Sequence, residues 1–167
     1  MARKRTRPTI ADEIQWMQQV RNYGYSIKNI KNPSTLIQMV AVHSCAAAIE
    51  YIENPPIEVQ YAAVSQYGNA IRFLKNPSPK IQMAAIKESA GHAIHFIENP
   101  CLSVQFTLLQ IDVNFITVIK NPHPRAQLCA VRRSPEIIFS IQNPCEQAKQ
   151  LAFRLKPDLL QHLLSTN

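Results

Sequence analysis

Hydrophobic residues recur along this chain at fixed distances from the dipeptide Asn-Pro, which occurs six times. The six occurrences are separated by 22, 22, 23, 22 and 22 residues and begin at Asn32, Asn54, Asn76, Asn99, Asn121 and Asn143. An aliphatic residue, almost always Ile, stands five residues and two residues before each of these Asn residues. Because positions i and i+3 share one face of a helix, each such pair predicts a short helix with one buried side.

A second apolar pattern follows each Asn-Pro step. An aliphatic or Ala residue stands five residues after the Asn, and a pair of apolar residues stands nine and ten residues after it, which predicts a second, longer helix. Since proline restrains the preceding residue to extended dihedrals, we expect each Asn to be the N-cap of this longer helix and each Pro to be its first residue. The three glycines, Gly24, Gly68 and Gly91, all lie eight residues before an Asn and predict the turn between the two helices.

Each unit is therefore expected to contain a helix of about ten residues, a turn and a helix of about seven, which are too short to be stable alone. Stacking of neighbouring units must stabilise them. The predicted fold is all-α, a right-handed α-solenoid (superhelix) of about six to seven short two-helix repeats. We expect residues 1–10 to form a basic disordered arm, residues 11–156 the tandem repeats, and residues 157–167 a C-terminal capping helix.

The units read Asn-Pro-x-x-x-Val-Gln-x-x-Ala-Val, then a Gly turn, then Ala-Ile-x-x-Ile-Lys. They resemble the short helical repeats of leucine-rich-repeat-variant and HEAT-like solenoids, and still more the Asn-Pro tandem repeats of uncharacterised large-bacteriophage proteins. The resemblance covers roughly Ile14 to Phe153. It implies a non-enzymatic protein-binding module, and its phage side implies an accessory or counter-defence factor that binds and inhibits a host protein in the host cytoplasm.

The net charge of +7 is unevenly distributed. Four of the 18 basic residues, Arg3, Lys4, Arg5 and Arg7, lie in the arm, which leaves 14 basic against 11 acidic residues elsewhere. A further basic cluster, toward the carboxyl end, consists of Lys120, Arg125, Arg132 and Arg133. Together the arm and this cluster keep open an alternative function, a nucleic-acid-binding solenoid that contacts backbone phosphates.

Two polar columns accompany the apolar ones. Gln stands six residues after five of the Asn residues, at Gln38, Gln60, Gln82, Gln105 and Gln127. This column is either a polar reading strip or, as we favour, a set of structural amides that bond to neighbouring turns. The residue just before Asn alternates in charge through Lys31, Glu53, Lys75, Glu98 and Lys120, so we expect adjacent repeats to attract each other and fix the stacking register.

Large apolar residues occupy a further column seven residues after Asn, at Met39, Tyr61, Met83, Phe106 and Leu128. This row is the best candidate for a contact strip with a partner, although packing between neighbouring helices is the role that we favour. Tyr23, Tyr25 and Tyr67 lie beside the turn glycines, where we expect an exposed aromatic rim. The candidate partner-binding residues are thus Tyr23, Tyr25, Tyr61, Tyr67, Met83 and Phe106.

The sequence offers no catalytic constellation. Glu50 and Glu53 are interpreted as a solvated face, and His92 and His95 as surface histidines without a third metal ligand. No HExxH, GxSxG or GxxxxGK[ST] motif occurs. We therefore expect no enzymatic activity, no metal and no small-molecule cofactor. The four cysteines show no CxxC spacing and no apolar run reaches 18 residues, which favours free thiols, no membrane insertion and a cytoplasmic location.

Overall fold

The computed structural model describes residues 9 to 159, and within this range α-helices alternate with 3-10 helices without any strand. The α-helices are α1 (Ile10–Asn22), α2 (Thr35–Ser44), α3 (Ile57–Gln66), α4 (Pro79–Glu88), α5 (Leu102–Ile111), α6 (Pro124–Arg133) and α7 (Glu146–Leu155). The 3-10 helices are η1 (Gly24–Asn29), η2 (Ala46–Tyr51), η3 (Gly68–Phe73), η4 (His92–Phe96), η5 (Val113–Val118) and η6 (Pro135–Ser140). The all-α prediction is confirmed, and the second helix of each unit is a 3-10 helix of five or six residues.

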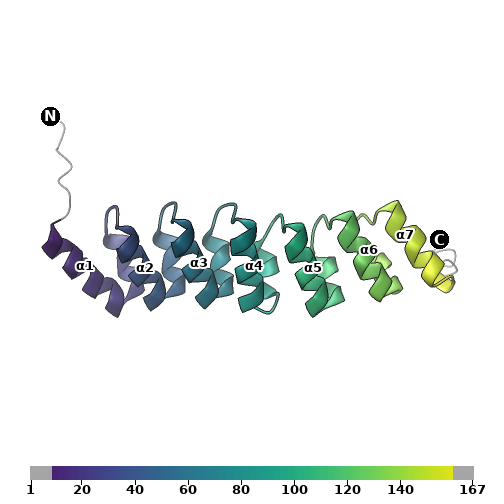
Figure 1. The fold of residues 1–167 in the computed structure, drawn as a ribbon, viewed down its shortest axis with the longest axis horizontal. Helices are drawn as coiled ribbons and strands as arrows, with labels where there is room; N and C mark the ends of the chain where they lie inside the picture. The colour runs from purple at the N-terminus through teal and green to yellow at the C-terminus, as the bar shows by residue number, and fades with distance from the viewer. Residues whose placement is uncertain (1–8, 160–167) are drawn as a thin grey trace, which may run out of the picture.

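The helices follow one another along a single axis, so the molecule is elongated (Figure 1). Each α-helix packs against the α-helices before and after it, and η1, η2, η3 and η4 pack in the same order. The α-helices thus form one layer and the 3-10 helices a second layer behind it. Segments pack against their neighbours in the chain, as expected for tandem repeats.

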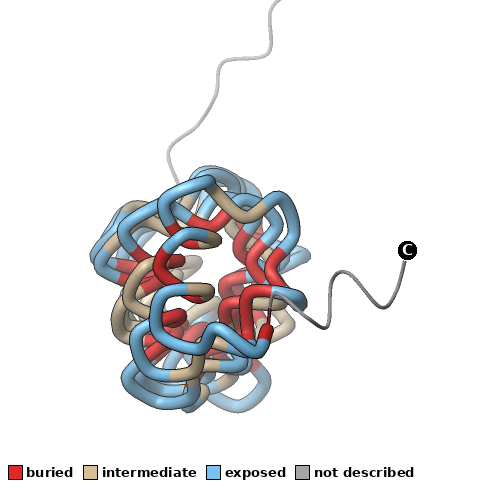
Figure 2. The backbone as a smooth tube through the Cα atoms, turned by 90° about the vertical axis from the view of Figure 1, so that its right-hand side faces the viewer, coloured by how far each residue is buried: buried red, intermediate tan, exposed pale blue. Residues whose placement is uncertain are grey.

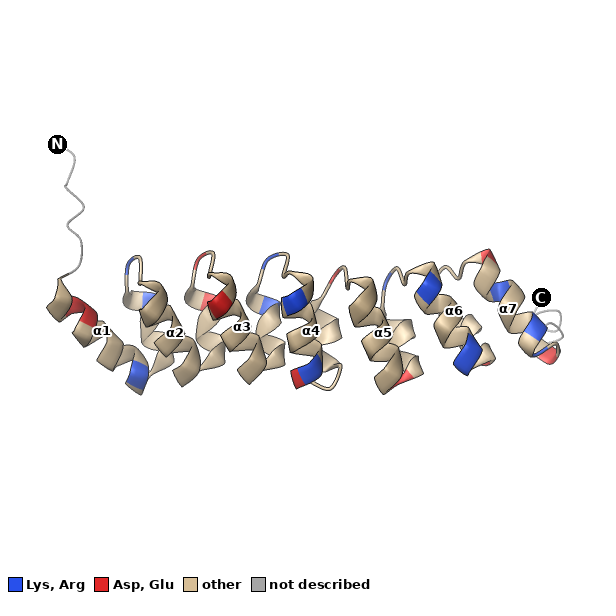
Figure 3. Ribbon diagram, in the orientation of Figure 1, with Lys and Arg blue, Asp and Glu red and all other residues tan. Residues whose placement is uncertain are grey.

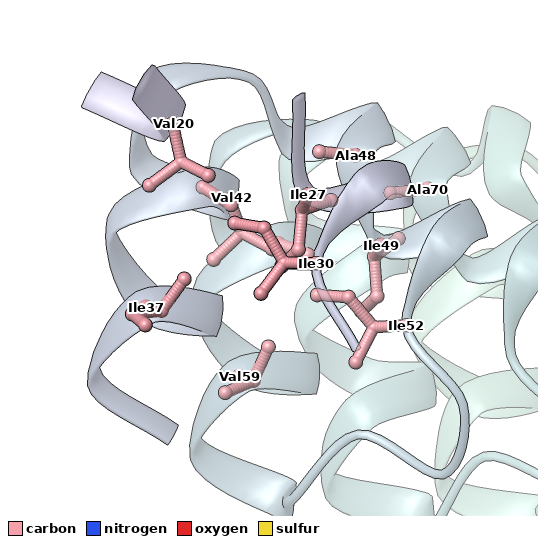
Figure 4. Packing of buried hydrophobic residues seen from close by; sticks show 12 residues of the cluster. Val20, Ile27, Ile30, Ile37, Val42, Ala48, Ile49, Ile52, Val59 and Ala70 are labelled. Atoms are coloured by element: carbon pink, nitrogen blue, oxygen red, sulfur yellow. The ribbon is translucent and has the colours of Figure 1, made fainter. Parts of the chain in front are cut away.

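The core lies between the two layers, where Figure 2 shows the buried residues gathered inside a ring of exposed ones. Figure 4 shows Ile27, Ile30, Ile49 and Ile52 of the 3-10 layer pointing toward the α layer. The predicted apolar columns are buried, with two exceptions, Leu74 and Phe153, which are half-buried. Each buried aliphatic side chain contributes on the order of 1.5–3 kcal/mol, so stacking stabilises helices that are too short to persist alone.

The Asn-Pro step has a different role from the one that the sequence predicted. The α-helices begin three residues after each Asn, and their N-caps lie two residues after it, at Ser34, Pro56, Ser78, Cys101, His123 and Cys145. Asn32, Asn54, Asn76 and Asn143 have positive φ, between 48° and 54°. Asn tolerates this left-handed conformation better than other side chains, and a following Pro disfavours the right-handed helical one. In these four repeats the left-handed Asn therefore turns the chain between two helices, and in all six repeats the Pro precedes the N-cap.

The first unit lacks an Asn-Pro step and begins in another way. The Thr9 side chain accepts a hydrogen bond from the Asp12 backbone N–H, while the Asp12 carboxylate accepts one from the Thr9 backbone N–H. This capping box satisfies two amides at the start of α1.

Gly24 and Gly68 are required by close packing rather than by backbone conformation. A Cβ at Gly68 would lie 2.5 Å from the carbonyl oxygen of Ala85, and one at Gly24 would lie 2.6 Å from that of Ala41. In both cases the carbonyl belongs to the α-helix of the next unit. Gly91 differs, because it has φ of 95° and follows Ala90, whose φ is 49°. These two residues form the longer turn that accounts for the single 23-residue spacing.

Candidate binding surfaces

The α layer carries the predicted row of large apolar side chains, here called the apolar strip, which consists of Met39, Tyr61, Met83, Phe106 and Leu128. Its members come from the five successive helices α2 to α6. Tyr61 is exposed, and the other four are half-buried. Each side chain therefore touches its neighbours and also presents surface to solvent.

The apolar strip borders a groove around Tyr61. This groove, of about 770 Å³, is bounded by residues of α2, α3 and α4, among them Met39 and Ile57. Ile57 is 48% exposed and Tyr61 is 44% exposed, so two large side chains of one helix face solvent in the same groove. The Lys80 ammonium lies 5.1 Å from the centre of the Tyr61 ring, close enough for a cation–π contact.

Charge is sparse on part of the α layer. Neither α2 nor α5 contains Lys, Arg, Asp or Glu, and Figure 3 shows both helices without charged residues. Met83 of α4 faces α5, because the Thr107 hydroxyl lies 3.5 Å from its sulfur. The strip therefore combines inter-helix packing with an open apolar surface.

The tyrosines of the predicted aromatic rim lie at or just after the ends of α-helices. Tyr23 and Tyr25 lie with ring centres 5.5 Å apart, and Tyr51 meets Tyr25 edge-on at 5.8 Å. Tyr25 is half-buried, and its pKa is raised above the ordinary value, chiefly by the neighbouring Cys45 thiol. Tyr67 is exposed and caps the end of α3 as Tyr23 caps the end of α1, whereas Tyr61 lies within α3.

The predicted basic cluster is divided between α6 and the loop before it. Arg125 and Arg132 are exposed and two turns apart on α6, about 10 Å along its axis. Arg133 is exposed too, and its side chain donates to the carbonyl oxygen of Leu109 in the last turn of α5. Lys120 is exposed in the loop before α6. Arg3, Lys4, Arg5 and Arg7 lie outside the described residues.

The Gln column is structural, as favoured from the sequence. All five side-chain amides donate to the Pro carbonyl of their own unit, over 2.8 to 3.1 Å. Gln82, Gln105 and Gln127 also accept from the N-cap backbone N–H of the next unit, over 2.8 to 3.0 Å. These three are buried, so they join adjacent repeats and are not available for recognition.

Three equivalent grooves, here called the edge grooves, lie between successive 3-10 helices and the Asn-Pro loops that follow them. The first contains Lys28, Lys31, Tyr51 and Glu53 and has a volume of about 610 Å³. The second contains Glu50, Glu53, Phe73 and Lys75, at about 600 Å³. The third contains Arg72, Lys75, Phe96 and Glu98, at about 590 Å³.

The edge grooves show what the sequence analysis missed. The alternating charges were recognised, and Figure 3 shows the loops before α2 to α6 alternately blue and red along one edge. The column of aromatic residues three positions before Asn was not recognised. It consists of Tyr51, Phe73 and Phe96. The charges of the edge grooves make no ion pair, since the ion pairs within residues 9–159 join Lys149 to Glu146 and Lys156 to Glu136.

The remaining predicted features are two histidines, four cysteines and the absence of a membrane span. His92 and His95 are exposed, and the described residues contain no group of three or more His, Cys, Asp or Glu that could hold a metal ion. All four cysteines are free and half-buried, which confirms the unpaired thiols. In the described part of the chain, no helix has the length and apolar character that crossing a membrane requires. Comparison with protein-family models, curated proteins and solved structures gave no match.

Proposed function

We propose that this chain is a non-enzymatic protein-binding module, built as a right-handed α-solenoid of six to seven short repeats, and that the apolar strip is its main contact surface. The observation that carries the proposal is the exposure of Ile57 and Tyr61 in one groove, at 48% and 44%. Clustered exposed aromatic and aliphatic side chains in a groove are typical of protein interaction sites.

The composition of the α layer also favours a protein partner. An apolar strip interrupted by few charges suits the apolar centre of a protein interface, whereas nucleic acid requires a continuous basic surface. Glu58 and Lys80 both line the Tyr61 groove, so both signs of charge flank the apolar residues. Such flanking charges would orient a partner rather than attract a polyanion.

The resemblance to phage tandem repeats suggests a biological role for this binding. In that role the module is an accessory or counter-defence factor that occupies a host protein and inhibits it in the host cytoplasm. The described geometry is compatible with a protein that acts by covering a surface of its partner.

Affinity capture from nuclease-treated bacterial lysate tests the proposal. We expect one protein to be retained by the unchanged chain and lost with Ile57→Ser/Tyr61→Ser, because the groove then loses its apolar anchors. Tyr67→Ser is the matched control, since Tyr67 is 39% exposed outside the strip. Equal capture by all three proteins would show that the strip is not the contact surface.

A second candidate function is contact with nucleic acid, favoured by the exposed Arg125 and Arg132 of α6 and by Arg154 of α7, which lines a groove with Arg132. Binding of a labelled oligonucleotide should then fall steeply between about 50 and 200 mM salt. It should also weaken with Arg125→Ala/Arg132→Ala and with removal of residues 1–7. Arg133 is left unchanged in this test because its side chain donates to the Leu109 carbonyl of α5.

A further inference from the structure

We infer that the three edge grooves form a second interaction surface, which binds an extended polypeptide segment carrying charges of alternating sign at about every third residue. This surface lies along the 3-10 layer and the Asn-Pro loops. It is distinct from the apolar strip, and the inference does not depend on the function proposed for that strip.

The grooves repeat the same construction. Each places an aromatic ring of the following repeat, Tyr51, Phe73 or Phe96, against a loop of the preceding one. Tyr51 and Phe96 are 44% and 41% exposed, so the rings line open surface. Three cavities of nearly equal volume in successive repeats form a linear series, which suits an elongated ligand better than a compact one.

The charges of the grooves alternate in sign. In the first groove Lys28 and Lys31 outweigh Glu53, which leaves one net positive charge. In the second, Glu50 and Glu53 outweigh Lys75, which leaves one net negative charge. The third is again positive by one, through Arg72 and Lys75 against Glu98. Because these side chains make no ion pair with one another, they remain available to a ligand.

The spacing of the grooves sets the spacing of the ligand charges. Packed helices lie about 8–10 Å apart, and an extended chain in the polyproline II conformation advances about 3.1 Å per residue with three residues per turn, so that every third side chain faces the same way. Adjacent grooves are therefore about three ligand residues apart. The complementary pattern is acidic, two neutral residues, basic, two neutral residues, acidic, and it is the same in either chain direction.

The Asn residues of the loops supply groups for the ligand backbone. Asn32, Asn54 and Asn76 are exposed and line the edge grooves. Among the described residues, none of their side-chain amides takes part in a hydrogen bond. A carboxamide offers both a donor and an acceptor, which is what a peptide unit requires. One such group per repeat matches a ligand that runs along the stack.

A polyanion fits this surface poorly. Nucleic acid presents the same charge at every step, so it would meet Glu50 and Glu53 in the second groove. An acidic or basic peptide of uniform sign meets the same difficulty in at least one groove. The alternation therefore selects a mixed-charge segment.

The test uses the full chain and a blocked, fluorescent peptide with the sequence Asp-Ala-Ala-Lys-Ala-Ala-Asp at low salt. Two comparison peptides are Lys-Ala-Ala-Asp-Ala-Ala-Lys and the all-acidic Asp-Ala-Ala-Asp-Ala-Ala-Asp. We expect the first peptide to bind about tenfold more tightly than the sign-reversed one, since each exposed pair contributes modestly and three act together. Amide chemical-shift changes should map to residues 28–32, 50–54 and 72–76.

A charge-reversal variant makes the test specific. Glu53→Lys makes the first two grooves positive, so affinity for the alternating peptide should fall about fivefold and affinity for the all-acidic peptide should rise by a similar factor. Glu58→Lys changes the net charge equally but lies on α3 in the other layer, and it should leave the peptide preference unchanged.

Any one of four results would overturn the inference, and the first three concern the peptides. They are equal binding of all three peptides, an equal response to Glu53→Lys and Glu58→Lys, and shift changes confined to the apolar strip. Tighter binding of a single-stranded oligonucleotide than of the alternating peptide would also contradict it. Ile57→Ser/Tyr61→Ser should not alter peptide affinity, so failure of the strip and failure of the edge grooves are distinguishable.

Discussion

Pro56, the N-cap of α3, has no backbone N–H to donate to Gln38, and the side-chain oxygen of Gln38 is consequently buried without a hydrogen-bond partner. In the equivalent positions of later repeats, the backbone N–H of Cys101 donates to Gln82 and that of His123 donates to Gln105. Proline has no N–H, so this inter-repeat bond cannot form between α2 and α3. The Gln column therefore joins some repeats more tightly than others.

The first prediction concerns this difference. Gln105→Met should destabilise the fold by about 2–3 kcal/mol, because it leaves the His123 N–H and the Pro100 carbonyl without their partner. Gln38→Met removes a single bond, to Pro33, and should cost about 1 kcal/mol less. Chemical denaturation of both variants measures the difference. Equal losses would mean that the bond to the next repeat contributes nothing.

The second prediction concerns close packing at the start of the 3-10 helices. Gly68→Ala should cost about 1–3 kcal/mol, because its Cβ would lie 2.5 Å from the Ala85 carbonyl oxygen and force the repeats apart. Ala46→Gly is the matched control in the same column, where a Cβ is already accommodated, and it should cost at most about 1 kcal/mol. If thermal unfolding showed the two changes to be equivalent, steric contact would not explain the glycine.

The third prediction separates the backbone role of Asn from its side-chain role. Asn143 has φ of 54°, so Asn143→Ala should lose about 1 kcal/mol through strain in the left-handed region. Asn143→Gly should be close to neutral, since glycine adopts this conformation freely. Calorimetric measurement of the unfolding free energy of the two variants distinguishes the two roles. A loss from Gly as large as that from Ala would indicate that the side-chain amide is what matters.

The fourth prediction concerns pH. The Lys156 ammonium holds the pKa of the Glu136 carboxyl below its ordinary value. A carboxyl whose pKa is lowered by folding stabilises the fold above its unfolded pKa, and this contribution is lost as pH falls through the folded pKa. Lys156→Met should raise the Glu136 pKa, measured by NMR titration. It should also reduce the loss of unfolding free energy as the pH falls through the acid range. An unchanged titration of Glu136 would show that Lys156 is not the cause.

Much of the fold follows from the sequence because its signal is repeated. The Ile residues five and two positions before each Asn sample the same environment in six units, and their burial confirms a common core. The Asn role was harder to predict, because extended and left-handed dihedrals both satisfy the constraint imposed by the following Pro. Only the backbone angles of residues such as Asn54 distinguish the two.

The candidate surfaces were less predictable for a different reason. Met83 and Phe106 are large and apolar whether they face a neighbouring helix or a partner, and their half-buried state shows that each packs against the fold and also presents surface to solvent. Phe73 and Phe96 could have been recognised as a column, but their place in a groove depends on how the next loop stacks. Arg133 is another such case, since its bond to Leu109 joins residues 24 positions apart.

Three residues, Ser89, Ala90 and Gly91, separate α4 from η4, whereas a single residue separates the α-helix from the 3-10 helix in the other repeats, yet α4 still packs against α5. The stacking of α4 on its neighbouring repeats therefore does not depend on a fixed length of the connection between α4 and η4. This position should accept an inserted tag or a protease cleavage sequence, and the severed halves should stay associated through their shared core. The chain could in this way be rebuilt as a two-fragment reporter whose reassembly signals binding.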